Sequence, residues 1–405
     1  MKRNFNIFII FLSFFVFSAS SYCDPKFLLG DEVLVYENIN ELKPLKVGLI
    51  TNQTGIMSDG THILDALLKH GIDVVKLFSP EHGIRGDETY SETDPMTGIH
   101  IVSLYGSKNA PSADDLQGVD VLVYDIQDVG ARFYTYTSTL YYCLKSAADN
   151  NKKLIVCDRP VILDADYTDG FTLDPAFRSF VGMIPAPVCY GMTCGELASY
   201  LKDQLKITAN ILEISRMENY TRSTDFNKLD IVWEQPSPNI YTSFSATSYP
   251  CTCFLEGTNV SEGRGTSMPF ESAGAPWVTG KTLADEMNSY GFAGVVFEPI
   301  TFRPKATEYV KEPKFKDTDC SGFYIHILDR LKFEPVKAGI ALLISLKKLF
   351  PDFKFNKDNY IDKLAGTDRL RKMVMDGKDL NAITDSYKKE LDDFKDLRKK
   401  YLIYN

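Results

Sequence analysis

Short apolar, β-branched runs alternate with helix-like segments from residue 46 onward, and this alternation constrains the fold more than any other feature. Residues 46–51 and 74–78 have the pattern of strands, and residues 62–71 between them have the apolar spacing of a helix. Strands that alternate with helices pair in parallel, with helices on both faces. The first half of the chain is therefore predicted to be an α/β domain with a Rossmann-like open parallel sheet. The same pattern predicts strands at 101–105, 119–126 and 153–157 and helices at 134–148 and 193–205.

A second, smaller domain is expected after a proline-rich break. Residues 234–239 (EQPSPN) interrupt regular structure, and residues 237–248 are polar and aromatic without a helical period, which favours a segment that crosses between or lines two domains. The expected boundaries are 24–250 for the Rossmann-like domain and 251–405 for an auxiliary α+β or α/β domain that contributes to a cleft. Within the second domain the sequence predicts strands at 294–300 and 322–328 and helices at 336–350 and 386–402.

Residues 1–20 have the layout of a secretory signal. Two basic residues at 2–3 precede the apolar run 5–17, and small residues follow it. Because the run is too short for a comfortable membrane span, we expect cleavage near its end and a periplasmic or secreted protein. Cys23 lies where a lipoprotein cysteine would lie, but the bulky Tyr22 before it makes lipid anchoring the less favoured alternative.

The composition, 44 % hydrophobic and 24 % charged over 405 residues, is ordinary for globular proteins. The formal net charge is −9, and removal of residues 1–20 with Lys2 and Arg3 would make it −11. An acidic chain of this kind disfavours nucleic acid and anionic membranes as partners. The eight cysteines show no dense disulfide spacing, and Cys251 and Cys253 lack the second pair or the histidines of a zinc site. We therefore expect mostly buried thiols, no metal and no cofactor.

Polar side chains follow the predicted strands, at the sheet edge where open parallel sheets bind ligands. The densest group, SPEHGIRG (79–86), follows the apolar run 74–78. A carboxylate here is partly desolvated, and the neighbouring His82 and Arg85 can shift its pKa in either direction. Glu81 is therefore the first candidate for a chemical role. The other polar groups at strand ends are Asn52, Ser79, Tyr105, Asp125, Gln127, Asp128, Asp158 and Arg159.

Several of these groups have a structural alternative that the sequence leaves open. Asp125 and Asp128 could turn the chain at Gly130 and cap the helix that carries Tyr134 and Tyr136. Asp158 and Arg159 could form a local ion pair that stiffens the following proline turn, and His82 could donate only to a backbone carbonyl.

A second polar cluster, residues 254–277, lies outside the predicted sheet. Glu256, Asn259, Glu262 and Arg264 are interspersed there with glycines that permit tight bends and close ligand approach. The phosphate-binding pattern GxxxxGK[ST] is absent, so nucleotide binding is disfavoured. Carboxylates, amides, arginines and aromatic rings together suit a polyhydroxylated, anionic ligand such as an acidic sugar.

Hydrolysis of a glycosidic bond usually needs two carboxyl groups, one protonated and one ionised. A serine hydrolase is less favoured because no GxSxG elbow occurs, and a metal hydrolase because His82 with Asp87 or Asp128 is a sparse ligand set. The candidate carboxylates are Glu81, Asp87, Glu88, Asp125, Asp128 and Glu262.

Long motifs in order along the chain resemble the exo-β-N-acetylmuramidase family. They include VGLITNQTGI (47–56), LFSPEHGIRGD (77–87), DIQDVGARFYTY (125–136), PSPN (236–239) and FLEGTNVSEGRGT (254–266), and the similarity extends over nearly the whole chain after residue 46. The resemblance implies a Rossmann-like catalytic domain, an auxiliary domain and a cleft between them. It also implies release of terminal N-acetylmuramic acid from the non-reducing end of peptidoglycan fragments.

Glu81 matches the glutamate of the family's SPEHG motif, so the resemblance implies that it is the acid/base. The candidates for the second carboxylate are Glu88, Asp128 and Glu262. One departure from the family pattern, Val161-Ile162-Leu163 after the DRP triplet, puts the contacts of that loop in doubt. The lactyl carboxylate of N-acetylmuramic acid should meet at least one of Arg85, Arg132, Arg159 and Arg264. The expected substrate-binding residues are Asn52, Ser79, His82, Arg85, Gln127, Arg132, Tyr134, Asn259 and Arg264. The alternative is an exported, non-catalytic binding protein for muramyl sugars.

Overall fold

The computed structural model describes residues 26–86 and 91–405, so the predictions for residues 1–20, Cys23, Asp87 and Glu88 lie outside the described residues. The first domain contains a six-stranded sheet in the order β3-β2-β1-β4-β5-β6, and every pair of neighbours is parallel. This is the strand order of a doubly wound Rossmann fold, so the predicted fold class is confirmed. The strands are β1 (Lys46–Thr51), β2 (Asp73–Ser79), β3 (Ile101–Ser103), β4 (Val121–Asp125), β5 (Lys153–Cys157) and β6 (Leu212–Ser215).

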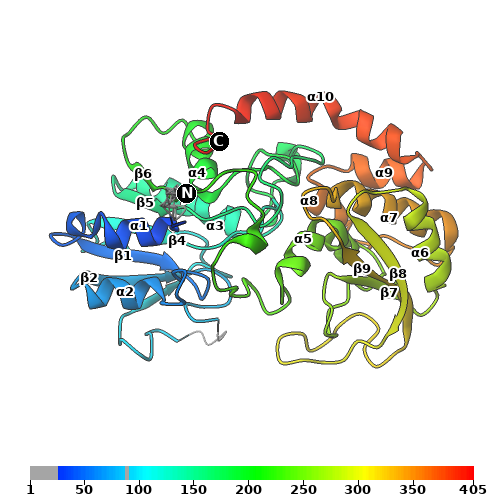
Figure 1. Cartoon of the computed structure of the whole chain (residues 1–405), viewed down its shortest axis with the longest axis horizontal. Coiled ribbons are helices and arrows are strands. Elements are labelled where there is room, and N and C mark those ends of the chain that lie inside the picture. The colour runs from blue at the N-terminus through cyan, green and yellow to red at the C-terminus, as the bar shows by residue number, and fades with distance from the viewer. Residues whose placement is uncertain (1–25, 87–90) are drawn as a thin grey trace, which may run out of the picture.

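Helices cover both faces of this sheet (Figure 1). Along β4, Val121 and Val123 pack in the core on one face, whereas Leu122 and Tyr124 pack in the core on the other. Helices α1 (Gly30–Tyr36) and α2 (Ile63–Lys69) belong to the first face, and α3 (Tyr136–Asp149) and α4 (Cys194–Gln204) to the second. The predicted cap of α4 is confirmed, because Thr193 Oγ1 accepts a hydrogen bond from the Glu196 amide at 3.2 Å.

The second domain has a three-stranded antiparallel sheet in the order β7-β9-β8 and is therefore α+β. Its strands are β7 (Ser272–Ala275), β8 (Val295–Phe302) and β9 (Cys320–Ile327). Its helices are α6 (Gly280–Ser289), α7 (Pro335–Leu349), α8 (Tyr360–Ala365), α9 (Arg369–Met375) and α10 (Leu380–Arg398). Short 3₁₀ helices occur at Ile39–Glu41, Pro175–Phe177, Phe226–Lys228 and Cys253–Gly257.

Residues 237–248 show no helical period in the sequence, yet they contain the start of a helix that was not predicted. Helix α5 (Ser243–Thr252) begins inside this segment, capped by Thr242 Oγ1, and packs against α7. Nearly all of its residues are buried, so it has no polar face and shows no helical period in the sequence. Helix α5 spans the expected boundary at residue 250, and it contributes Tyr249 to the pocket described below.

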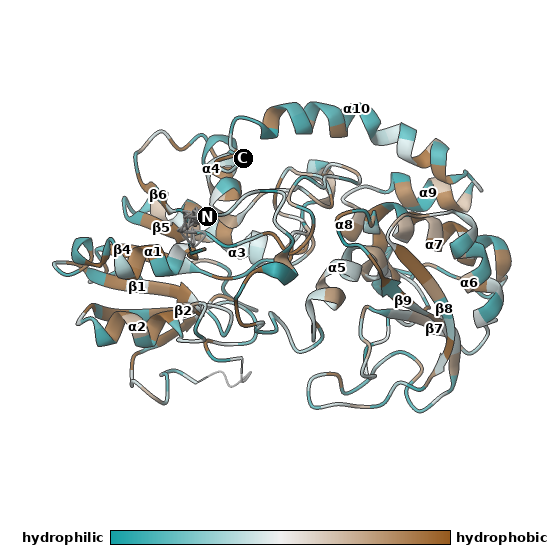
Figure 2. Cartoon of the chain, viewed as in Figure 1, coloured by the Kyte–Doolittle hydropathy of each residue, from teal (hydrophilic) through white to brown (hydrophobic). Residues whose placement is uncertain are grey.

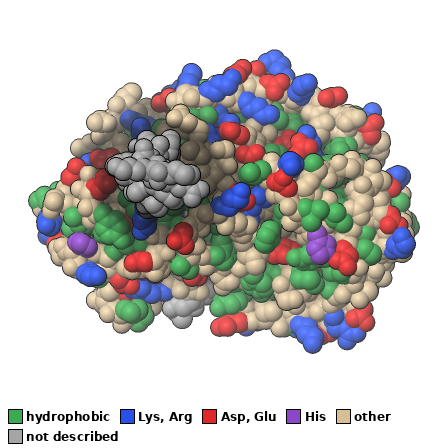
Figure 3. All heavy atoms as spheres, viewed as in Figure 1, with side chains coloured by type: hydrophobic (Ala, Val, Ile, Leu, Met, Phe, Trp, Pro, Cys, Tyr) green, Lys and Arg blue, Asp and Glu red, His purple; other side chains and the backbone are tan. Residues whose placement is uncertain are grey.

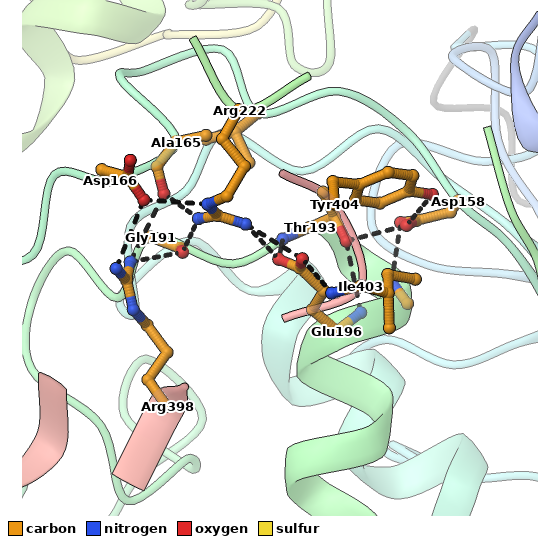
Figure 4. Close-up of polar contacts among 12 residues, drawn as sticks. Asp158, Ala165, Asp166, Gly191, Thr193, Glu196, Arg222, Arg398, Ile403 and Tyr404 are labelled. Atoms are coloured by element: carbon orange, nitrogen blue, oxygen red, sulfur yellow. Dashed lines mark hydrogen bonds and ion pairs between the residues drawn. The ribbon is translucent and has the colours of Figure 1, made fainter. Parts of the chain in front are cut away.

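Helix α10 carries the end of the chain from the second domain back to the first (Figure 1). There the Ile403 amide donates to Glu196 Oε1 at 2.9 Å and the Tyr404 hydroxyl donates to Asp158 Oδ2 at 2.7 Å. Arg222 and Arg398 both donate to the carbonyl of Gly191 (Figure 4). The C-terminal residues therefore form part of the first domain's polar core.

One apolar core is shared by the two domains, since a single cluster runs from Ile50 and Tyr124 to Leu342 and Phe394. The hydropathy colouring shows apolar central strands and a mostly polar α10 (Figure 2). Acidic and basic side chains are interspersed over the visible face (Figure 3).

The cysteines in the described part of the chain are buried free thiols, as expected. Across residues 26–86 and 91–405, no helix combines the length and apolar character that a bilayer span requires.

Candidate active site

A pocket of about 200 Å³ is lined by residues of both domains. The first domain contributes the ends of β2 and β3 and the residues at the start of α3. The second contributes the segment around α5, the loop before β7 and helix α8. The polar residues that line it include Glu81, His82, Tyr105, Tyr134, Thr135, Tyr136, Asn239, Glu256, Arg264 and Tyr360.

Glu81 lies on the turn that follows β2, and its side chain is half-buried. The turn requires left-handed backbone at His82 (φ 74°) and Gly83 (φ 78°), which the glycine adopts without strain. Thr135 Oγ1, at the start of α3, donates a hydrogen bond to Glu81 Oε2 at 3.2 Å. The carboxylate is thus held at the pocket wall by the neighbouring helix.

Buried tyrosines surround this carboxylate. Burial raises the pKa of Tyr134 and Tyr136, and the charge of Glu81 raises both further. The two rings meet edge to face at 4.8 Å between centroids, and Tyr134 also meets Tyr249 of α5 at 5.6 Å. These hydroxyls therefore stay protonated at neutral pH, and the rings form an apolar wall beside Glu81.

The second domain contributes Glu256 and Arg264 to the same pocket. Arg264 Nη2 donates to Glu256 Oε1 at 2.7 Å, and its guanidinium lies 4.9 Å from the centre of the Phe270 ring. Burial raises the pKa of Glu256, although Arg264 opposes this shift. Burial disfavours the Arg264 cation, but Glu256 and Glu262 outweigh it and raise the Arg264 pKa. Arg264 is therefore a permanent positive charge in the pocket.

Glu262, a predicted catalytic residue, lies behind Arg264 and not on the pocket surface. It is 4 % exposed, accepts a hydrogen bond from Lys314 Nζ at 3.0 Å and lies 3.6 Å from Arg264 Nε. This arrangement suits a residue that positions Arg264 and contacts no substrate.

Asp128 and Gln127 lie beside a separate, much smaller cleft. The Tyr190 hydroxyl donates to Asp128, and burial raises the pKa of Asp128 to about 7. Gln127 Nε2 donates to the carbonyl of Pro160 at 2.8 Å. Asn52 Oδ1 accepts hydrogen bonds from the Thr54 amide and hydroxyl. These three predicted site residues have internal partners, and none of them lines the pocket around Glu81.

Ser79 and Arg85 line a neighbouring cleft, which is distinct from the one around Glu81. Arg85 donates to Asp65 Oδ1 at 3.0 Å and to Asp94 Oδ1 at 3.2 Å. Asn259 Nδ2 donates to the backbone carbonyl of Asp352, so it joins two segments of the second domain.

The other two arginines considered for the lactyl carboxylate are buried. Arg132 is 0 % exposed and donates to backbone carbonyls, including that of Leu364 in α8. Arg159 pairs with Asp125 at 2.6 Å and Asp31 at 2.8 Å instead of the adjacent Asp158. Within the described residues, Arg264 is the arginine that lines the pocket around Glu81.

Of the predicted site residues, the structure thus brings together Glu81, His82, Tyr134 and Arg264. Glu256 and Tyr360 also line the pocket but were not predicted as site residues. Glu256 lies in the FLEGTN motif, in the same polar cluster of the sequence as Arg264. That shared cluster was the sequence signal that could have identified it. Tyr360 has no such signal, because it reaches the pocket only through the placement of α8.

Comparison with known proteins identifies the family. The chain matches the N-terminal region of "Exo-beta-N-acetylmuramidase NamZ" over residues 47–243 and the C-terminal region over residues 247–404. It is 39 % identical over 387 residues to "Peptidoglycan beta-N-acetylmuramidase NamZ" of Bacillus subtilis (strain 168), covering 94 % of this chain and 92 % of that protein.

Two crystal structures of DUF1343 family proteins from Bacteroides fragilis NCTC 9343 have a similar fold. Their TM-scores are 0.87 and 0.77, and each is 32 % identical to this chain, covering 94 % of it and 99 % of its own length. The protein is therefore a glycoside hydrolase that belongs to the exo-β-N-acetylmuramidase NamZ family.

Proposed function

We propose that this protein releases terminal N-acetylmuramic acid from the non-reducing end of peptidoglycan fragments, with Glu81 as general acid/base. The observation that carries the proposal is the joining of Glu81, Glu256 and Arg264 in one pocket formed by both domains. The pocket combines two carboxylates for the chemistry with one fixed cation for an acidic sugar. The peptidoglycan activity named for the Bacillus relative supports the same substrate class.

Glu81 gives its proton to the glycosidic oxygen as the bond from that oxygen to the sugar's anomeric carbon breaks. A water molecule then supplies the hydroxyl group that the released sugar gains at this carbon, and the remaining proton of the water passes to a carboxylate of the pocket. We propose Glu256 as the second carboxylate, because among the described residues it is the one other carboxylate that lines the pocket. Glu88 stays a prediction, since it lies outside the described residues.

Arg264 is our candidate for the lactyl carboxylate. It is 32 % exposed on its side chain, so part of the guanidinium faces the pocket. Its hydrogen bond to Glu256 uses one of five N–H donors and leaves others for a ligand carboxylate. Lys314 holds the Glu262 carboxylate at 3.0 Å, and Glu262 in turn forms an ion pair with Arg264 at 3.6 Å.

Substitution of Glu81 tests the acid/base role. We expect Glu81→Gln to lower kcat/KM by at least about 100-fold, since general acid catalysis contributes factors of that order. The loss should be larger on the disaccharide N-acetylmuramyl-N-acetylglucosamine than on a 4-nitrophenyl β-N-acetylmuraminide, because nitrophenolate leaves without a proton. The exposed Glu37→Gln is the matched control and should behave as wild type. A Glu81→Gln enzyme as active as wild type on both substrates would remove the proposed role.

The alternative from the sequence, a binding protein for muramyl sugars, predicts a different result. Calorimetry would then show binding of the disaccharide by the wild-type protein without any release of sugar.

Export also stays a proposal, supported by the pattern of residues 1–20. N-terminal sequencing of protein from the culture medium or periplasm tests it, and an intact first twenty residues would contradict it.

A further inference from the structure

Three aromatic side chains lie in a row beside the proposed catalytic pocket. Tyr105 lines the pocket after β3, and its ring centroid is 6.0 Å from that of Phe180. Phe180 in turn lies 6.5 Å from Tyr142 of α3, with the two rings inclined by only 19°. All three side chains are half-buried, so each keeps part of its surface in contact with solvent.

The middle ring is held by a fixed turn. Residues 179–182 form a tight loop in which the Ser179 and Gly182 amides each donate to the other residue's carbonyl, at 3.1 and 3.0 Å. Ser138 Oγ of α3 donates to the Phe180 carbonyl at 2.6 Å. Val181, the next residue in this turn, lines the pocket itself. The fold therefore presents Phe180 at the edge of the pocket on a backbone with little freedom.

We propose that Tyr105, Phe180 and Tyr142 form the binding surface for the sugar on the leaving side of the scissile bond. This inference rests on the proposed function, in which the pocket holds the terminal N-acetylmuramic acid. The next sugar of the fragment must then lie just outside the pocket. Flat aromatic faces suit this position, because the C–H faces of a sugar ring stack on them while its hydroxyls stay in water.

The lining residues support this division. Tyr105 belongs both to the pocket and to the aromatic row, so it marks the point where the bound fragment would pass from one to the other. Tyr142 belongs to α3, and Thr135 and Tyr136 at the start of this helix line the pocket.

The competing explanation is that the rings only pack to stabilise the loop. Phe180→Leu distinguishes sugar binding from simple loop packing, because leucine keeps an apolar side chain in the turn but removes the flat ring. Phe180→Tyr keeps the ring and is the matched control. Tyr142→Leu gives a second variant on a different element, in case the loop tolerates no change.

Two substrates with different leaving groups provide the readout. The disaccharide N-acetylmuramyl-N-acetylglucosamine has a sugar on the leaving side, whereas β-N-acetylmuramyl fluoride has none. We expect Phe180→Leu and Tyr142→Leu to lose roughly five- to tenfold in kcat/KM on the disaccharide, mainly through a higher KM. Both variants should match wild type on the fluoride, and Phe180→Tyr should match wild type on both substrates.

Equal losses on the two substrates, or no loss on either, would overturn the aromatic subsite while the proposed function stands. A wild-type protein that hydrolyses neither substrate would instead overturn the proposed function, and the subsite with it.

Discussion

At the scale of single residues, Arg264 should decide which sugar the pocket prefers. We expect Arg264→Lys to lower kcat/KM on a muraminide roughly ten- to hundredfold, because lysine keeps the charge but loses the planar fork that matches a carboxylate. The corresponding N-acetylglucosaminide lacks the lactyl carboxylate and should be affected far less. Arg85→Lys, which changes an arginine paired with Asp65 and Asp94 outside the pocket, is the control. An equal loss on both sugars would show that Arg264 only braces the pocket.

The sequence could place Glu81 at a ligand-binding edge of the sheet but could not choose among the arginines. Glu81 directly follows a buried strand, and the end of a parallel strand is an edge where ligands bind. Arg132 and Arg264 both lie in polar motifs, and their difference arises from distant packing. Arg132 is covered by α8, whose Leu364 carbonyl accepts its hydrogen bond from 232 residues away. A contact of that range leaves no local pattern in the sequence.

At the scale of secondary-structure elements, helix α2 depends on the protonation of His62. His62 Nδ1 accepts a hydrogen bond from the Leu64 amide at 3.2 Å, and Nε2 lies 3.0 Å from the Asn52 carbonyl, to which it donates. This arrangement needs the neutral ring, since a protonated Nδ1 accepts no bond. Burial lowers the His62 pKa below its usual 6.5, in agreement with this geometry.

The His62 cap should therefore make stability fall in acid. Below about pH 6.5, His62 takes up a proton in the unfolded chain but not in the folded protein, which favours unfolding. The contribution of His62 to the free energy of unfolding is therefore complete above this pH. It is lost as the pH falls towards the lower pKa of folded His62. His62→Asn keeps a cap that does not titrate. Urea unfolding at about pH 7.5 and about pH 5.5 should show a smaller acid loss for His62→Asn than for wild type or the control His70→Asn. Equal acid losses in all three proteins would contradict the proposed cap.

The sequence predicted most of the long elements but missed α5, α6, α8 and α9 and two short strands. Strands β1, β2, β4 and β5 were recognisable because strands buried on both faces are nearly continuous apolar runs. The short strands β6 and β7 were not predicted, and β7 (Ser-Ala-Gly-Ala) has little β propensity. Helix α5 was missed because burial on all sides removes the amphipathic pattern.

At the scale of the whole molecule, the proposed catalytic pocket depends on how the two domains are held together. The pocket takes Glu81 from one domain and Glu256 from the other, so a change in their relative position would separate the two carboxylates. The C-terminal segment after α10 is one such connection, because it starts from the second domain and ends in the polar core of the first (Figure 4).

Tyr404 gives the clearest test of this connection. Its hydroxyl donates to Asp158 at 2.7 Å and accepts from the Met217 amide at 2.9 Å, so Tyr404→Phe leaves both groups without this partner. We expect a loss of about 1–3 kcal/mol in the free energy of unfolding, as for other unsatisfied hydrogen-bonding groups in a protein interior. Urea unfolding measures this loss, with the exposed Tyr309→Phe as control.

If the C-terminal segment also fixes the two domains, raising the urea concentration should lower kcat/KM of Tyr404→Phe before the variant begins to unfold. If Tyr404→Phe instead loses activity and unfolds at the same urea concentration, and that concentration equals the wild-type midpoint, the C-terminal segment neither stabilises the protein nor fixes the domains.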